Sequence, residues 1–252
     1  MKKHNTHTIK EPNQDKIRTL AELLGRPQHK LVWNMRHFFG SYLPYLSNAR
    51  VLDVGCGKGA TTFYAALCGA KEIVAIEPEA AGSSHGSSKV FMDVRENMGF
   101  TQCSLKQMDF MEYTTDTLFD VILLYNSINH IRETTLDVQK SPTAYQSQKQ
   151  VVSHISQLLK PQGRVILCDC NRNNFFDDLG FRNPLTRSVN RKKHQNLRVW
   201  RSLLSEHDFG NFCHNWYIPY MLPWAGHLLD NPISNYFTFG YFVLRGEKKL
   251  PV

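Results

Sequence analysis

The chain has 252 residues, of which 42% are hydrophobic, and a formal net charge of +8. This length can bury a sizeable core, and no stretch approaches the roughly 20 consecutive apolar residues of a membrane-spanning helix. The polar start lacks the apolar core of a secretory signal, and the six cysteines show none of the paired spacings of a metal site. We therefore expect a cytoplasmic protein without a bound metal or a membrane span; composition leaves the oligomeric state open.

The first part of the chain is predicted to be helical. Apolar residues recur at helical spacing over residues 13–46, with an interruption at Gly25-Arg26-Pro27. This pattern predicts two helices. We expect residues 1–46 to form an N-terminal helical extension and residues 47–252 to form the main domain.

A glycine-rich loop after an apolar run is the most informative motif. Residues 51–54 predict a strand that carries the acid Asp53, and Gly55, Gly57 and Gly59 follow at every second position. Residues 60–68 then predict a helix. Strand, glycine turn and helix together are typical of a nucleotide-cofactor loop, because glycine lets the backbone turn sharply and approach a ligand. The spacing differs from the G-x-G-x-x-G of dinucleotide-binding loops.

Three more strands are predicted in order after this loop. Residues 72–77 form a short apolar run that ends in Glu77, about 20 residues past the glycine loop, where an acid can accept hydrogen bonds from a ribose. Residues 105–110 predict a third strand, and residues 119–124 predict a buried parallel strand. The latter leads to Asn126 and His130 at the edge where ligands bind in open α/β folds.

The rest of the chain predicts further helices and strands. Residues 143–159 show a helical stripe, and Lys160-Pro161-Gln162-Gly163 predicts a turn into a fifth strand. Residues 171–199 are rich in Asn, Arg and Phe and predict a loop-rich insertion. Beyond a helix near residue 200, residues 212–218 and 236–244 predict the last two strands.

This order of motifs resembles the class I S-adenosylmethionine-dependent methyltransferases. The Asp53-to-Gly59 loop is similar to motif I of that family, and the segment at Lys160 is similar to its "LKPGG" turn, with Gln162 in place of the first glycine. The resemblance implies a Rossmann-like α/β fold: a seven-stranded, mostly parallel sheet with an antiparallel final strand and helices on both faces. It also implies that residues 1–46 act as a helical lid and that the insertion after strand five, about 171–199, lies over the substrate.

The same resemblance implies S-adenosyl-L-methionine as cofactor and S-adenosyl-L-homocysteine as product. In the family, the residue at Glu77 takes both ribose hydroxyls, an acid at Asp109 accepts from the adenine amino group, and the residue at Phe110 packs on the ring. Each of these acids could instead be an ordinary surface residue. The predicted cofactor-binding residues are Asp53, Gly55, Cys56, Gly57, Glu77, Pro78, Asp109, Phe110 and Asn126.

Methyl transfer depends mainly on alignment, and a hydroxyl acceptor also benefits from a general base. His130 is the best-placed candidate because imidazole titrates near neutrality, although it could equally be a packing residue. Asn126 is a second candidate for contact with the substrate. His194 and His37 are weaker candidates.

The distribution of charge and the motif after the fourth strand indicate which class of molecule accepts the methyl group. Residues 1–50 carry nine Lys/Arg against three Asp/Glu, and residues 182–201 carry seven Lys/Arg and no acid. Such segments can attract an anionic small molecule, an anionic membrane surface or RNA. The Asn/Asp-Pro-Pro-Tyr/Phe signature of amino-directed nucleic-acid methyltransferases is absent at residues 126–129. We expect a small-molecule acceptor, O- slightly favoured over N-methylation; the alternatives are an RNA methyltransferase and a catalytically silent cofactor-binding protein.

Overall fold

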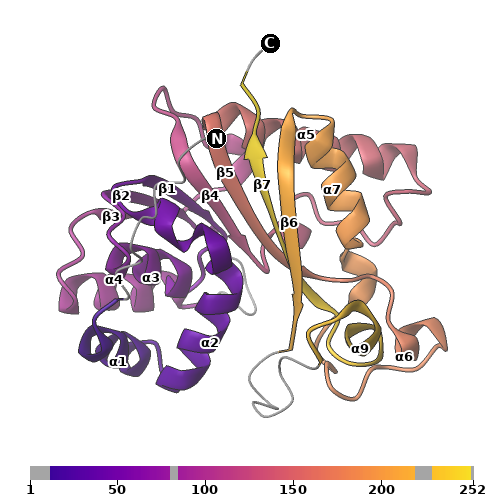
Figure 1. Ribbon diagram of the computed structural model, residues 1–252, viewed down its shortest axis with the longest axis horizontal. Helices are drawn as coiled ribbons and strands as arrows, with labels where there is room; N and C mark the ends of the chain where they lie inside the picture. The colour runs from indigo at the N-terminus through magenta and orange to yellow at the C-terminus, as the bar shows by residue number, and fades with distance from the viewer. Residues whose placement is uncertain (1–11, 80–84, 219–228, 251–252) are drawn as a thin grey trace, which may run out of the picture.

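The computed structural model describes residues 12–79, 85–218 and 229–250. Its centre is a seven-stranded sheet with the strand order β3-β2-β1-β4-β5-β7-β6 (Figure 1). Strands β1 to β5 are parallel, and β7 runs antiparallel between β5 and β6. This confirms the predicted sheet. The strands are β1 (Arg50–Val54), β2 (Glu72–Ile76), β3 (Cys103–Lys106), β4 (Phe119–Tyr125), β5 (Leu159–Cys170), β6 (Phe209–Tyr217) and β7 (Tyr241–Lys248).

Helices cover both faces of the sheet, as predicted. The α-helices are α1 (Gln14–Leu23), α2 (Gln28–Phe39), α3 (Ala60–Leu67), α4 (Ser87–Asn97), α5 (Pro142–Leu158), α6 (Phe175–Asp178), α7 (Leu197–Ser205) and α9 (Pro232–Phe237). The 3₁₀ turns are η1 (Gly40–Leu46), η2 (Phe110–Glu112), η3 (Ile128–His130) and η4 (Arg191–Lys193). One apolar core lies between the sheet and the helices α1, α2, α3 and α4. A second lies between the other face of the sheet and the helices α5 and α7. None of the helices in the described ranges combines the length and apolarity of a bilayer span.

Several predicted strand boundaries were wrong. Strand β6 begins at Phe209 rather than at residue 212, and β5 begins at Leu159 and so includes the predicted turn at residues 160–163. The third strand ends at Lys106, and Asp109 instead caps η2 by accepting a hydrogen bond from the Met111 amide at 2.7 Å. The last strand begins at Tyr241, so residues 236–240 do not belong to it: helix α9 extends to Phe237 and a turn follows. Pro232 suits the first turn of a helix, and the Asn231 side chain caps it, so local capping overrode the strand propensity of the aromatic run.

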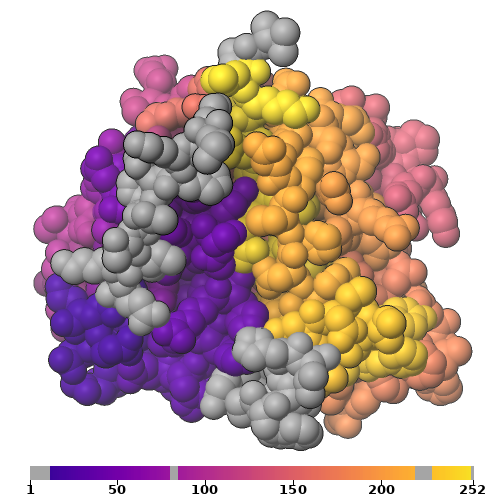
Figure 2. Space-filling model, viewed as in Figure 1, coloured from indigo at the N-terminus to yellow at the C-terminus, as the bar shows by residue number. Residues whose placement is uncertain are grey.

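The N-terminal helices are anchored to the last strand of the sheet. Arg245 of β7 is 4% exposed and donates hydrogen bonds to the carbonyls of His37, Phe38 and Phe39 at the end of α2. These carbonyls have no partner within the helix, so the guanidinium satisfies them. Gly40, the residue after α2, has φ +51°, and a Cβ there would lie 2.6 Å from Arg245 Nη2, so both the backbone conformation and the close approach favour glycine. Figure 2 shows the indigo N-terminal helices packed directly against the orange and yellow C-terminal strands.

Candidate functional site

A cavity of about 570 Å³ lies at the carboxyl ends of β1, β2 and β4. We call it the carboxyl-edge cavity. Eight of the residues predicted from the sequence line it: Gly55, Gly57, Glu77, Pro78, Asp109, Phe110, Asn126 and His130. Two others, Asp53 and Cys56, do not line it. The remaining lining residues include four that the sequence did not single out: Ser127, Ile131, Glu133 and Lys193.

The glycine loop forms one wall of the carboxyl-edge cavity. At Gly55 an added Cβ would lie 2.4 Å from the Ser127 Cβ, so this position is restricted by packing. At Gly57 the backbone has φ +52° and a Cβ would meet no atom within 4 Å. Since Gly57 lines the cavity, the missing side chain leaves open space at the loop. The Gly57 amide donates to Glu77 Oε2 at 2.8 Å, which joins the loop to the end of β2.

Asp53 supports the loop from beneath rather than facing the cavity. Its carboxylate is fully buried, and Oδ2 accepts hydrogen bonds from the hydroxyls of Thr61 and Thr62, both at 2.6 Å. These bonds fix the end of β1 to the first turn of α3. Burial raises the pKa of Asp53 to about 6. Cys56 is also buried, and burial raises the pKa of its thiol well above the usual value.

The other predicted cofactor residues complete the cavity. Glu77 is buried, whereas Asp109 is exposed at the edge of the cavity. The Phe110 ring packs edge-on against His154, with ring centroids 4.8 Å apart. Asn126 has φ +54°, and its Oδ1 accepts from the Cys168 thiol at 3.4 Å. Asn126 also lines the carboxyl-edge cavity.

His130 belongs to a chain of three polar side chains on the cavity wall. Its Nδ1 lies 3.1 Å from Glu133 Oε2, and Lys193 Nζ lies 2.7 Å from Glu133 Oε1. The hydrogen bond from Lys193 is the largest cause that lowers the pKa of Glu133, which keeps it ionised. Sequence reasoning missed Glu133 and the role of Lys193. The three-residue spacing of His130 and Glu133 was a weak signal, but nothing in the sequence indicated a contact 60 residues away.

The two weaker histidine candidates lie elsewhere. His37 lies in a groove between α2 and β6, with Nε2 3.5 Å from Asp230 Oδ2. His194 Nδ1 lies 2.6 Å from Oδ1 of the fully buried Asp169, whose other oxygen accepts from Trp200 Nε1 at 3.2 Å. Neither histidine lines the carboxyl-edge cavity.

One group in the described residues has the donor atoms of a metal site. Ligand atoms of Asp169, Cys170 and His194 lie within 4.8 Å of one another. Burial raises the pKa of the Cys170 thiol well above its usual value, which favours the neutral form over the thiolate that binds metals. The hydrogen bond between Asp169 and His194 already satisfies two of the three groups.

Comparisons with known proteins agree with the fold. A family model described as a methyltransferase domain matches residues 46–215. The YcgJ protein from Bacillus subtilis is 17% identical with a TM-score of 0.57, and the match covers 89% of this chain and all of the other. The [4+2]-cyclase SpnF is 15% identical with a TM-score of 0.58, covering 94% of each chain. Comparison with curated protein sequences gives no match.

At these identities the structural neighbours show the fold alone, and the name of one of them is a cyclase. The family model carries the assignment, because it matches well over half of the chain and includes the glycine loop and strands β1 to β5. The chain therefore belongs to the methyltransferase domain family, and it is an S-adenosylmethionine-dependent methyltransferase.

Proposed function

We propose that this enzyme transfers the methyl group of S-adenosylmethionine to a small-molecule acceptor, and that the acceptor atom is a hydroxyl oxygen. One observation supports this most strongly. The glycine loop, the two acids and the histidine with its carboxylate partner all line a single cavity. A cavity that holds both the methyl donor and a base is what methylation of a hydroxyl requires.

We assign the cofactor to the carboxyl-edge cavity, whose residues fit it. The open space at Gly57 can take a ligand close to the backbone. Glu77 can accept hydrogen bonds from the ribose hydroxyls, and Asp109 can accept one from the adenine amino group. Phe110 offers an apolar surface to the base, and Pro78, Gly55 and Asn126 complete the lining. Asp53 and Cys56 act indirectly, by holding the loop.

The proposed base is His130. A carboxylate at Nδ1 favours the tautomer in which Nδ1 carries the proton, so Nε2 is left to accept one from the acceptor hydroxyl. Glu133 fixes the ring and stabilises the imidazolium that forms, while Lys193 holds Glu133. Bound S-adenosylmethionine supplies an already activated methyl group, so the residues need only orient the acceptor and remove its proton. A nitrogen acceptor with a free lone pair would need less of this machinery.

The lid role of residues 1–46 remains a proposal. In the described residues, α1 and α2 do not contribute to the lining of the carboxyl-edge cavity. The Trp33 and His37 side chains of α2 line the groove beside β6 instead. A lid function therefore predicts that cross-linking α2 to β6 slows turnover.

The test is a screen of hydroxyl- and amine-bearing metabolites with S-adenosylmethionine, read by mass spectrometry for a 14 Da gain. Replacing the proposed base in His130→Gln should lower kcat on the identified hydroxyl acceptor by about 10²–10⁴-fold, with unchanged cofactor affinity. His214→Gln, at an exposed position on β6, is the matched control. Full activity of His130→Gln would refute the base. Methylation of RNA alone, or cofactor binding without turnover on any acceptor, would refute the proposed function.

A further inference from the structure

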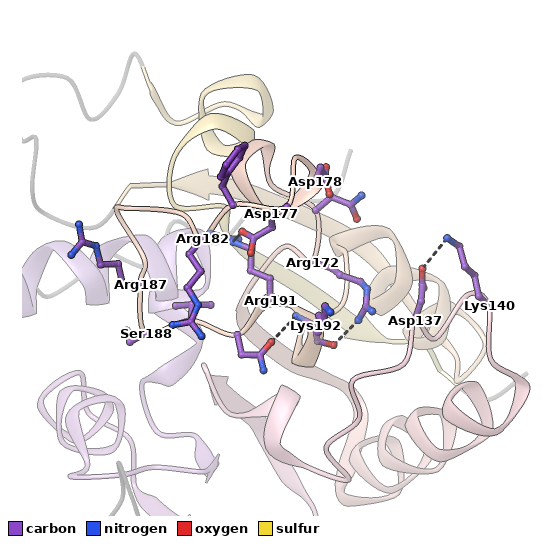
Figure 3. Close-up of a pocket in the computed structure, with 15 residues that line it drawn as sticks. Asp137, Lys140, Arg172, Asp177, Asp178, Arg182, Arg187, Ser188, Arg191 and Lys192 are labelled. Carbon is purple, nitrogen blue, oxygen red and sulfur yellow. Dashed lines mark hydrogen bonds and ion pairs between the residues drawn. The ribbon is translucent and has the colours of Figure 1, made fainter.

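A second, larger cavity of about 980 Å³ lies within the insertion that follows β5. We call it the insertion cavity. It shares no lining residue with the carboxyl-edge cavity. Six cationic side chains line it against three acidic ones, which gives it an excess of positive charge (Figure 3). The cationic residues are Lys140, Arg172, Arg182, Arg187, Arg191 and Lys192, and the acidic residues are Asp137, Asp177 and Asp178.

The three acids are already engaged. Asp177 Oδ2 lies 3.1 Å from Arg191 Nε, and Asp178 Oδ2 accepts from the Tyr236 hydroxyl at 3.0 Å. Asp137 Oδ2 lies 3.8 Å from Lys140 Nζ. Asp177 and Asp137 thus lie beside cations of the wall itself, and the cavity as a whole keeps an excess of positive charge.

Two arginines build the wall. The Arg191 side chain is 2% exposed and donates to the carbonyls of Asn171 and Phe239 at 2.9 and 2.8 Å. Arg172 donates to the carbonyls of Lys192 and Thr135 at 2.6 and 2.9 Å. These bonds fix the irregular backbone of the insertion, so the cavity is a preformed feature rather than a loose loop.

Two further cations are not used in this way. The side chains of Arg182 and Lys192 are exposed and line the cavity, and they form no hydrogen bond or ion pair with another residue in the described ranges. In Figure 3 both lie with Arg172 and Arg191 in the same group, whereas Arg187 lies at its outer edge. Phe181, which also lines the cavity, is 67% exposed. The exposed Phe181 ring thus lines the same cavity as the unpaired side chains of Arg182 and Lys192.

We propose that the insertion cavity is an oxyanion-binding site that takes the phosphate or carboxylate group of a small organic ligand. A planar guanidinium binds such groups through paired hydrogen bonds, and a lysine adds a point charge. The volume falls within the range of small-molecule pockets, which favours a compact ligand over a polymer or a membrane surface. Phe181 can cover the organic part of the ligand.

The insertion cavity is adjacent to the proposed catalytic residues along the chain. Lys192 lines the insertion cavity, whereas the next residue, Lys193, lines the carboxyl-edge cavity and pairs with Glu133. The two cavities are therefore lined by neighbouring residues of the short turn η4. The proposal concerns binding alone and does not depend on methyl transfer.

Calorimetric titration of the full chain with phenyl phosphate tests the site without any methyl acceptor. The double variant Arg182→Gln/Lys192→Gln should weaken binding at least about tenfold, since two charge-assisted hydrogen bonds are lost. Lys89→Gln/Arg198→Gln removes the same charge at exposed positions outside the cavity and should bind as the wild type does. Equal affinity in both double variants would overturn the proposal, as would absence of binding by the folded wild type.

Two further probes identify the source of the oxyanion. Vesicles of phosphatidylserine in phosphatidylcholine and a 20-nucleotide RNA are tested at low and physiological salt. Binding of phenyl phosphate together with no binding to vesicles supports the small-ligand site. Binding of vesicles or RNA with a steep salt dependence, and none of phenyl phosphate, would overturn it, because surface charge and released counterions would then carry the interaction.

Discussion

The buried Asp53 carboxylate should make the stability of the ligand-free protein fall as pH rises. Its folded pKa of about 6 exceeds the ordinary aspartate value of 3.8, with burial as the largest cause. The folded state therefore binds more protons than the unfolded state between these values, and the free energy of unfolding decreases across this window. The shift corresponds to about 3 kcal/mol in total, and about 2 kcal/mol of it falls between pH 4.5 and 7.5.

The measurement compares urea unfolding of the wild type with Asp53→Asn over that pH range. The amide does not titrate, so the stability of the wild type relative to the variant should fall by about 2 kcal/mol from pH 4.5 to 7.5. The Asp53 carboxyl ¹³C shift of the wild type gives the pKa directly, even if the variant folds poorly.

Asp120→Asn is a control with the opposite sign. Burial raises the Asp120 pKa, but hydrogen bonds from Lys160 and the Arg50 amide outweigh this and lower it overall. Asp120 thus contributes stability that is present above its unfolded pKa and lost as the pH falls through its folded pKa. A flat difference for Asp53→Asn, or the same slope for both variants, would refute the burial argument.

Other substitutions test the remaining contacts. Glu77→Ala should weaken S-adenosylmethionine binding by about 1.5–3 kcal/mol, and Gly57→Val should abolish it by filling the open space, both by calorimetry on folded protein. Gln162→Gly should raise the free energy of unfolding by about 0.5–1 kcal/mol, because Gln162 adopts φ +62°. Gly163→Ala should instead lower it by about 1–3 kcal/mol, since a Cβ would lie 2.7 Å from the Lys160 carbonyl oxygen; urea unfolding measures both. Arg191→Met should lower the free energy of unfolding by about 1–3 kcal/mol for each carbonyl, Asn171 and Phe239, that loses its donor, and the insertion should lose its protection from hydrogen exchange early.

The sequence predicted the parts of the fold that local rules determine. The glycine loop could be predicted because its three glycines adopt positive φ, a conformation that other residues rarely adopt. The strands at residues 50–54 and 72–76 could be predicted because both of their faces are buried and their sequences are apolar. The eight predicted residues that meet in the carboxyl-edge cavity come from the ends of parallel strands, which reach one edge of the sheet in any such fold.

The parts that were missed depend on long-range contacts or on competing local signals. The predicted last strand includes the two aromatic residues that end helix α9, Tyr236 and Phe237, because aromatic residues favour a sheet. The helix start at Asn231 and Pro232 outweighs this preference. An ion pair with Lys193 holds Glu133 in place, and hydrogen bonds to the carbonyls of residues 171 and 239 hold Arg191 in its buried position. No periodicity along the chain encodes such contacts.

The anchoring of α2 by Arg245 has a consequence for biosynthesis. Arg245 lies 207 residues beyond Phe38, whose carbonyl it caps. At ribosomal rates, roughly 10–40 s pass between the synthesis of the two residues. During this interval α2 lacks its cap and β5 lacks its neighbour β7, so the apolar faces that they later bury are open to other molecules in the cell. The apolar faces of α2 and β5 are therefore buried only after β7 has been synthesised.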